Sequence, residues 1–175
     1  MNPTPGPEPR PVGLDLRLTR AARRWGGHPP VAAGGRALSC AGEHAAVWLA
    51  VGLLGAALDR PQRQVWLRST ALVAGAHLVS MAVKRVARRP RPHLPGLPPL
   101  VYTAGTHSLP SSHAASSAAA AVAFRTLLPG PATALLAAAV CGSRLVVGVH
   151  YPTDVVAGAA LGAATAALGR SWADG

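Results

Sequence analysis

A run near the C-terminal end of the chain combines residue types that suit phosphoryl transfer. Arg144 is followed six residues later by His150, and His150 is followed four residues later by Asp154. The planar guanidinium of an arginine can bind two phosphate oxygens at once. A neutral histidine can attack phosphorus, and a carboxylate can hold its other ring nitrogen in the required tautomer. This spacing predicts phosphoryl transfer through a histidine nucleophile.

Two further segments upstream supply the groups that such a reaction still needs. Lys84 and Arg91 lie seven residues apart in a basic run, and a Pro-Ser-Ser-His segment ends at His113. The chain has 17 lysines and arginines, and Lys84 is the only lysine among them. A lone lysine at this position indicates a specific role for an ammonium group.

The three segments together resemble the motifs of the type 2 phosphatidic acid phosphatase superfamily, which also contains the vanadium haloperoxidases. The family motifs read Lys-x6-Arg-Pro, Pro-Ser-Gly-His and Ser-Arg-x5-His-x3-Asp. The first and third match at every defined position, whereas the second has Ser112 where glycine is usual. The matching segments extend from Lys84 to Asp154, nearly half of the chain.

This resemblance implies a role for each motif residue and implies neither a metal nor a cofactor. Fixed cations and the start of a helix would bind the phosphate and stabilise charge in the transition state: Lys84, Arg91, Arg144, Ser111 and Ser112. His150 would be the nucleophile, with Asp154 as its partner across the turn that Pro152 indicates. His113 would protonate the leaving oxygen and then activate water.

A finer resemblance lies upstream, where Gly42-Glu43-His44 precedes Val-Trp-Leu. This run is similar to the start of the first membrane helix in the decaprenylphosphoryl-5-phosphoribose phosphatases, a subgroup found with mycobacterial-type cell walls. That subgroup is similarly short and has a Gly-Val-His-Tyr-Pro run like residues 148–152. A carboxylate at the head of an apolar run is costly unless it is paired. We therefore expect Glu43 or His44 to contact the substrate's sugar or a motif arginine.

The composition favours an all-α, polytopic transmembrane helical bundle. Hydrophobic residues make up 50% of the 175 residues, but aromatic residues only 4%. Small apolar residues suit helices that pack closely in a membrane. Five apolar segments approach spanning length: residues 38–58, 65–83, 113–128, 132–149 and 155–168. Counting crossings, all three motifs arrive on the same face of the membrane.

The N-terminal part differs in character from these segments. Residues 1–11 are rich in proline, lack the pattern of a signal peptide and are expected to be disordered. Residues 14–25 alternate apolar and arginine positions, which predicts an amphipathic helix on the membrane surface, or alternatively a solvated helix. Residues 26–35 are expected to be a Gly/Pro-rich connection. We therefore divide the chain into an N-terminal region, 1–37, and a membrane-embedded phosphatase domain, 38–175.

Several other classes of protein do not fit the sequence. Six acidic residues and no Cys/His cluster argue against a metal-dependent phosphatase, and Cys40 and Cys141 are interpreted as packing residues. The net charge of +11 fits anionic lipids and an anionic substrate better than nucleic acid, because aromatic residues for base stacking are scarce. No obligate protein partner is evident. The remaining histidines are interpreted as structural or loop residues: His28, His77, His93 and His107.

The distribution of basic residues favours a cytoplasmic active site. Six arginines precede the first apolar segment, and five basic residues lie between Lys84 and Arg91 on the same predicted side. The opposite side carries fewer: Arg60, Arg63, Arg68, Arg125 and Arg170. The positive-inside rule then places the motif side in the cytoplasm.

The prediction that follows is a metal-independent lipid phosphate phosphatase of the cell membrane. The first choice of substrate is a polyprenyl-linked phosphosugar, followed by undecaprenyl pyrophosphate and phosphatidate. Vanadate-dependent peroxidation is an alternative chemistry, but such peroxidases are soluble and the apolar segments argue against it. A lipid-binding protein with a decayed site is the non-enzymatic alternative, and the intact histidine and aspartate positions argue against that.

Overall fold

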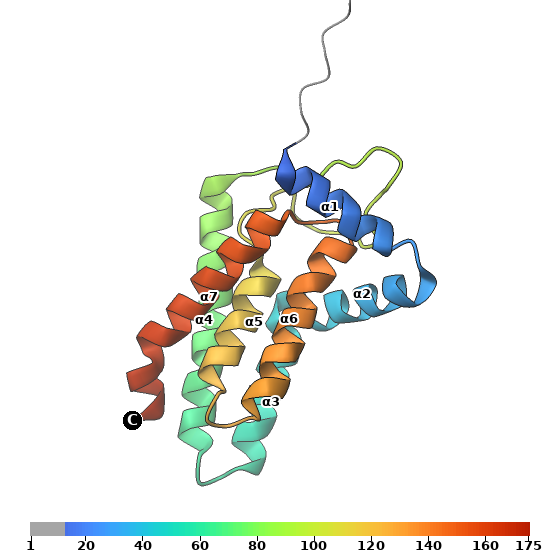
Figure 1. Ribbon diagram of the computed structural model, residues 1–175. Coiled ribbons are helices and arrows are strands. Elements are labelled where there is room, and N and C mark those ends of the chain that lie inside the picture. The colour runs from blue at the N-terminus through green and yellow to red at the C-terminus, as the bar shows by residue number, and fades with distance from the viewer. Residues whose placement is uncertain (1–12) are drawn as a thin grey trace, which may run out of the picture.

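The computed structural model describes residues 13–175, and this part of the chain is helical (Figure 1). Seven α-helices and one 3-10 helix follow in the order α1 (Leu14–Trp25), α2 (Pro29–Ala41), η1 (Glu43–Ala45), α3 (Ala46–Leu58), α4 (Arg63–Ala87), α5 (Ser112–Ala123), α6 (Gly130–Val146) and α7 (Pro152–Asp174). The described residues form no strand, and a single isolated bridge pairs Pro90 with His107. The all-α prediction is confirmed.

Helix α5 is the centre of the bundle and packs against α4, α6 and α7. It consists almost entirely of alanine and serine, and most of its residues are buried. Gly158 and Gly162 of α7 face the α5 backbone so closely that a Cβ would lie 2.3 Å from the Ser111 oxygen and 1.9 Å from the Ala115 oxygen. Small residues four apart let two helix backbones approach each other, as in membrane helix pairs.

The larger side chains fill the opposite end of the bundle, between α3, α4 and α5. Trp48 and Phe124 are buried there, and the Phe124 ring lies 5.6 Å from that of Trp66. Gly55 of α3 lies directly against the Trp66 ring, where a Cβ would come within 2.4 Å. These aromatic residues form part of the apolar core near the C-terminal end of α5, whereas polar residues gather near its N-terminal end.

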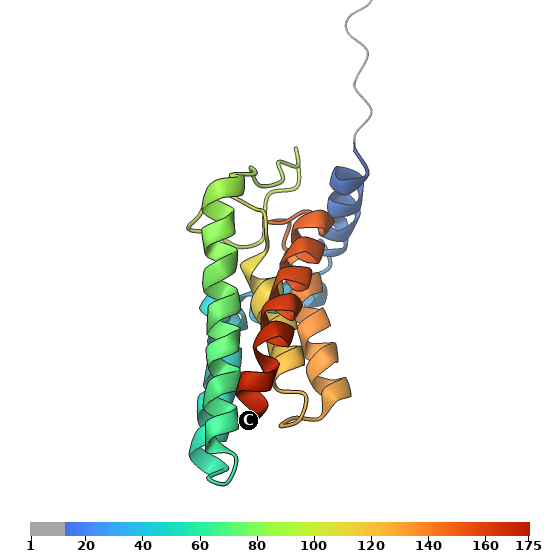
Figure 2. The same cartoon turned by 90° about the vertical axis from the view of Figure 1, so that its left-hand side faces the viewer.

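Helix α1 coincides with the predicted amphipathic helix over 14–25. It lies across the end of the bundle that carries the long loop 88–111 (Figures 1 and 2). Leu14 and Trp25 are exposed, whereas Thr19 and Arg23 are buried against the rest of the protein. An arginine on the inner face was not part of the prediction.

The expected connection over residues 26–35 is wrong, because α2 begins at Pro29. Two prolines occupy its first positions, where their fixed φ and missing N–H suit the start of a helix. The boundary drawn between residues 37 and 38 accordingly falls inside α2. The predicted disorder of residues 1–11 lies outside the described residues.

The first apolar segment is not one continuous helix. It is interrupted at residues 42–45, where the pair formed by α2 and the following helix bends by 54°. His44 and Ala45 have φ values of 51° and 62°, a left-handed conformation that is uncommon for residues other than glycine. The bend turns Glu43 and His44 away from the helix axis. Backbone strain of this kind concentrates at functional sites.

The other four apolar segments are helical, with shifted ends. Helix α5, which corresponds to the third segment, ends at Ala123 rather than at residue 128, and α7, which corresponds to the fifth, extends on to Asp174. Judged by length and composition, α4 is the one helix of the described part that could cross a membrane alone. The bent pair α2–α3 would be a second crossing if it forms one span.

Candidate active site

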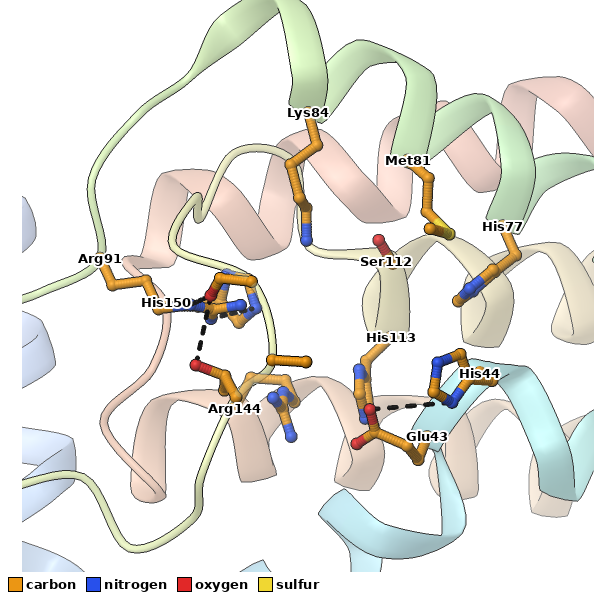
Figure 3. A pocket seen from close by; sticks show the side chains of 13 residues that line it. Glu43, His44, His77, Met81, Lys84, Arg91, Ser112, His113, Arg144 and His150 are labelled. Atoms are coloured by element: carbon orange, nitrogen blue, oxygen red, sulfur yellow. Dashed lines mark hydrogen bonds and ion pairs between the residues drawn. The ribbon is translucent and has the colours of Figure 1, made fainter.

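The three motifs meet in one cavity at the α1 end of the bundle, as the count of crossings predicted. The cavity has a volume of about 190 Å³ and is lined mainly by polar side chains (Figure 3). Its lining comprises Glu43, His44, His77, Met81, Lys84, Arg91, Thr103, Ala104, Gly105, Ser112, His113, Arg144 and His150. Residues far apart in sequence thus form one site.

Three cations face the cavity, and two of them are held by backbone or hydroxyl groups. Arg91 donates from Nε to the Gly105 oxygen at 2.8 Å and from Nη1 to the Val149 oxygen at 2.9 Å. Arg144 donates from Nη1 to the Ser39 hydroxyl. Its buried Nε has no hydrogen-bond partner in the described part of the chain. Lys84 extends from α4 toward the same space (Figure 3). An unpartnered guanidinium nitrogen beside further cations is suited to an anion.

His150 lies on the turn between α6 and α7, with Asp154 directly behind it. Its Nδ1 is 3.5 Å from Asp154 Oδ2, which also accepts a hydrogen bond from the Tyr151 N–H at 2.8 Å. Helix α7 begins at Pro152, so the pair meets across a helix start, as predicted. The other nitrogen, Nε2, lies 3.5 Å from Arg91 Nη1 and is the one directed at the cations.

The environment of His150 keeps its ring neutral. The pKa of His150 is lowered to about 4, chiefly by burial. The nearby cations Arg144, Arg91 and Lys84 lower it further, and Asp154 opposes these effects only in part. At neutral pH the ring therefore carries one proton. With Asp154 facing Nδ1, that proton belongs on Nδ1, and Nε2 keeps an unprotonated lone pair 3.5 Å from Arg91 Nη1. An unprotonated Nε2 is what an attacking nitrogen requires.

His113 is oriented by a backbone carbonyl rather than by a carboxylate. Its Nε2 lies 3.0 Å from the Ser39 oxygen, which fits an N–H donating to that carbonyl and leaves Nδ1 for proton exchange. Gly42 makes this position accessible, because a Cβ there would lie 2.6 Å from His113 Cδ2. The interruption between α2 and α3 thus gives room to a motif residue of α5.

The two serines of the second motif have different surroundings. Ser111 is fully buried, does not line the cavity, and caps α5 by accepting a hydrogen bond from the Ala114 N–H at 3.4 Å. Ser112 lines the cavity at the first turn of α5. The predicted phosphate contact therefore falls to Ser112 and the helix start, whereas Ser111 shapes that start.

A second group of polar residues occupies the other side of the cavity (Figure 3). Glu43 Oε1 lies 3.8 Å from His44 Nδ1, and the rings of His44 and His77 are 6.3 Å apart. His77 was interpreted as structural, but it lines the cavity, and its buried Nδ1 has no partner among the described residues. Its spacing from Met81 and Lys84, four and seven residues on one helix face, could have revealed it.

No group of three or more histidine, cysteine, aspartate or glutamate side chains in residues 13–175 is placed to hold a metal ion. The cavity's cations would repel one. The residues present are those of an anion site.

Comparison with known proteins identifies the family. The model of the PAP2 superfamily matches residues 64–174, well over half of the chain. The chain belongs to the PAP2 superfamily. The match includes all three motifs, so the cavity described above is the site that the PAP2 motifs form.

Two curated PAP2 relatives carry the same description. The chain is 44% identical to the decaprenylphosphoryl-5-phosphoribose phosphatase of Mycolicibacterium smegmatis over 148 residues, 85% of this chain and 82% of the relative. It is 39% identical to the decaprenylphosphoryl-5-phosphoribose phosphatase of Mycobacterium tuberculosis over 140 residues, 80% of this chain and 79% of the relative. This PAP2 protein is therefore a phosphatase, a phosphoric monoester hydrolase.

A solved structure shares the fold. The crystal structure of a transmembrane PAP2 type phosphatidylglycerolphosphate phosphatase from Bacillus subtilis aligns with a TM-score of 0.77 at 23% identity, covering 91% of this chain and 84% of that one. The likeness to a transmembrane PAP2 phosphatase supports a membrane location for the chain.

Proposed function

We propose that this PAP2 phosphatase removes the phosphomonoester of a polyprenyl-linked phosphosugar of the decaprenylphosphoryl-5-phosphoribose kind, in cell-wall precursor synthesis. The observation that carries the proposal is the cavity itself: three cations and the motif histidines His113 and His150 line it, in a chain 44% identical to a phosphatase described for that substrate. The product would be the dephosphorylated lipid-linked sugar and inorganic phosphate.

In the first step His150 Nε2 attacks phosphorus, and the bond from phosphorus to the ester oxygen breaks. Once the phosphate dianion is bound, His113 carries a proton on Nδ1 in addition to the Nε2–H on the Ser39 carbonyl. It donates this Nδ1 proton to the ester oxygen, so the sugar leaves as a neutral alcohol. Asp154 accepts the Nδ1–H of His150 and stabilises the charge that develops on the ring. The cations Lys84, Arg91 and Arg144 stabilise the equatorial oxygens as the phosphoryl group transfers.

In the second step water enters the place of the alcohol. His113, now deprotonated, takes a proton from this water, whose oxygen forms a bond to phosphorus. The bond between phosphorus and His150 Nε2 breaks, and phosphate leaves. Each proton lost in one step is restored in the other, so the site returns to its starting state without an external reagent.

We further propose that the chain crosses the membrane several times, about five in all, with the cavity facing the cytoplasm. Helix α1 and the basic loop 88–111 lie at one end of the bundle, and the turns after α3 and α5 lie at the other (Figure 1). The motif residues that line the cavity, such as Lys84 and Arg91, belong to the first of these ends. The greater number of arginines at the cavity end supports this orientation. A cytoplasmic site suits a lipid intermediate made inside the cell. Labelling of a cysteine introduced at exposed Tyr102 by a membrane-impermeant reagent, in a Cys40→Ser, Cys141→Ser background, tests the orientation: labelling in intact cells would contradict it.

Glu43, His44 and His77 are proposed to bind the sugar hydroxyls. They occupy the cavity opposite the phosphate-binding cations, and a carboxylate with two imidazoles offers both acceptors and donors to a polyol. We expect Glu43→Gln and His44→Ala each to raise KM about ten-fold for the phosphoribose lipid, because a lost hydrogen bond to substrate weakens binding by on the order of 1 kcal/mol or more. Activity on phosphatidate, which has no sugar, should change less than two-fold.

A matched control for these two variants is His93→Ala. His93 is exposed in the loop 88–111 and does not line the cavity. Equal losses on the phosphoribose lipid and on phosphatidate would show that Glu43 and His44 act on the phosphate site in general, and the sugar contact would have to be abandoned.

The substrate is tested by phosphate release from three lipids, with purified protein in detergent and EDTA present. These are decaprenylphosphoryl-5-phosphoribose, undecaprenyl pyrophosphate and phosphatidate, each also incubated with the His150→Ala variant as a blank. We expect kcat/KM to be highest for the first. A higher value for either of the other two would assign the chain to carrier recycling or to phospholipid metabolism instead.

A further inference from the structure

Arg89 lies in sequence between the motif cations Lys84 and Arg91, but it is not among the residues that line the cavity. It is one of the variable positions of the first motif, and its side chain instead turns toward the start of α7. Its Nη1 donates to Asp154 Oδ1 at 2.9 Å and to the Thr153 hydroxyl at 2.6 Å. Its guanidinium also stacks over the Tyr151 ring, 4.0 Å from the ring centre. One arginine thus contacts three of the four residues that follow His150.

The same guanidinium is tied to α1. Its Nη2 donates to Asp15 Oδ2 at 2.6 Å. Asp15 accepts two more hydrogen bonds, from the Thr153 N–H at 3.1 Å and from the Thr153 hydroxyl at 2.5 Å. Burial alone would raise the pKa of Asp15, but the hydrogen bonds from Thr153 and Arg89 lower this pKa, so the carboxylate is charged at neutral pH. An aspartate from a distant helix therefore caps the start of α7.

Helix α1 is fixed over this turn by contacts besides Asp15. Arg23 is buried and donates from Nε to the Pro98 oxygen at 2.9 Å. Its Cδ lies 2.9 Å from where a Cβ of Gly148 would be, so the glycine leaves room for it. Gly26 is similarly close to the Val146 oxygen, 2.7 Å from a Cβ built there. The position of α1 is thus defined relative to residues 146–151.

These contacts hold both oxygens of Asp154 in place. Oδ1 is bound by Arg89, and Oδ2 accepts from the Tyr151 N–H and faces His150 Nδ1. The plane of the carboxylate is therefore set by Arg89, and the direction of Arg89 is set by Asp15. Without Asp15, the Arg89 fork could turn both of its nitrogens to Asp154 and draw the carboxylate away from His150.

We propose that Asp15 and Arg89 are positioning residues of the active site, through which helix α1 fixes the Asp154 carboxylate that orients His150. This rests on the proposed histidine mechanism. Asp15 lies outside the residues that the PAP2 model matches, and Arg89 lies at a variable position of the motif. The inference concerns a contribution of this chain's N-terminal helix and not of the shared motifs.

The test compares kcat and KM of Asp15→Asn and Arg89→Gln with those of wild type, on whichever lipid of the substrate comparison wild type hydrolyses fastest. We expect each variant to lower kcat about ten-fold, the size of effect seen when a residue that orients a directly acting side chain is lost. KM should stay within about two-fold, because neither residue lines the cavity. Arg89→Lys should behave like Arg89→Gln, since an ammonium cannot bridge two carboxylates with a planar fork.

Asp174→Asn is the matched control. Asp174 also pairs with arginines, at 3.6 Å from Arg170 and 3.9 Å from Arg125, but at the far end of the same helix. It should leave kcat unchanged. If Asp15→Asn also leaves kcat unchanged, or lowers it only in proportion to the protein lost as aggregate on gel filtration, α1 has no positioning role and the proposal is overturned.

Two further readouts separate positioning from a general loss of structure. The double variant Asp15→Asn, Arg89→Gln should be no slower than the slower single variant, because the two residues act in series. Losses that multiply in the double variant would contradict this.

Arg89→Gln should also move the acid limb of the pH profile of kcat to higher pH, since removing the cation raises the pKa of Asp154. An unmoved limb would contradict the contact with Asp154. If His150→Ala retains activity, the histidine mechanism itself fails, whatever Asp15 does.

Discussion

Replacing His150 by alanine is expected to lower phosphate release by at least about 10⁴-fold. The side chain is 2% exposed, is kept neutral by burial, and has one nitrogen on Asp154 and the other toward the cations. His113, the other motif histidine of the cavity, does not offer its Nε2 in the same way, because that nitrogen contacts the Ser39 carbonyl. Losses of this size accompany removal of a nucleophile in enzymes whose catalytic groups act as a unit.

The measurement is phosphate release in detergent, with His93→Ala as the control. His93 is an exposed histidine of the neighbouring loop, and its loss should change the rate less than two-fold. Retention of more than a few per cent of wild-type activity by His150→Ala would exclude a phosphohistidine on this residue.

The intermediate itself can be accumulated with His113→Ala. A phosphomonoester with a good leaving group, such as p-nitrophenyl phosphate, needs no proton from His113 in the first step. The second step still needs a base for water, so phosphate should remain on His150. Acid-labile, alkali-stable label on the His113→Ala protein, absent from the double variant with His150→Ala, is the expected result.

The motifs could be predicted from the sequence because their chemistry depends on a few residue types at fixed spacings. Lys84, Arg91, Arg144, His113 and His150 all line the predicted site. Their convergence followed from helix count alone, since the segments between them are long enough to bring each motif to the same end of the bundle. What remains a proposal is the part that each residue plays in the reaction.

The break in the first apolar segment could not be predicted in the same way. The polar pair Glu43-His44 interrupts the hydropathy of residues 38–58, but a polar pair does not by itself indicate a bend, and Ala45 is not a residue that usually adopts positive φ. At the bend Gly42 passes close to His113 of another helix, a tertiary contact that a local pattern does not contain. The same reasoning applies to Asp15, whose partners Arg89 and Thr153 lie 74 and 138 residues away.

The helix α2 was missed for a different reason. Glycine and proline are usual in loops, and residues 26–35 contain four glycines and two prolines. Here both prolines stand at the first turn of the helix, where they are tolerated, and Gly35 packs against Val146 and Val147 of the neighbouring turn. Small residues were interpreted as a sign of close helix packing elsewhere in the chain, and Gly35 has that role in α2.

Replacing Gly162 by alanine is expected to destabilise the protein by about 3 kcal/mol, a fall in Tm on the order of 10 °C. A Cβ at this position would lie 1.9 Å from the Ala115 oxygen and 2.8 Å from its Cα, and neither atom can move without shifting α5. The gain in helix propensity from alanine, about 1 kcal/mol, does not offset such a clash. Thermal unfolding in detergent, followed by circular dichroism, measures the change.

Gly142→Ala is the matched control, because it makes the same substitution inside α6 at an exposed position with no atom within 4 Å of the added Cβ. Its Tm should stay the same or rise by a few degrees, since only the helix propensity changes. Equal Tm values for Gly162→Ala and Gly142→Ala would mean that α5 and α7 are not packed backbone to backbone.

The neighbouring glycine extends this argument to the active site. A Cβ on Gly158 would lie 2.3 Å from the backbone carbonyl oxygen of Ser111. The Ser111 N–H in turn donates to the backbone carbonyl oxygen of Asp154 at 2.9 Å. Gly158 therefore lies where the start of α5, which carries His113, meets the start of α7. Gly158→Ala should lower kcat about ten-fold even at temperatures where the protein is fully folded, because a shift on the order of 1 Å between catalytic groups is enough for such a loss. Gly162, one turn farther from the site, should lose mainly stability, and a kcat at low temperature that falls equally in both variants would contradict this division.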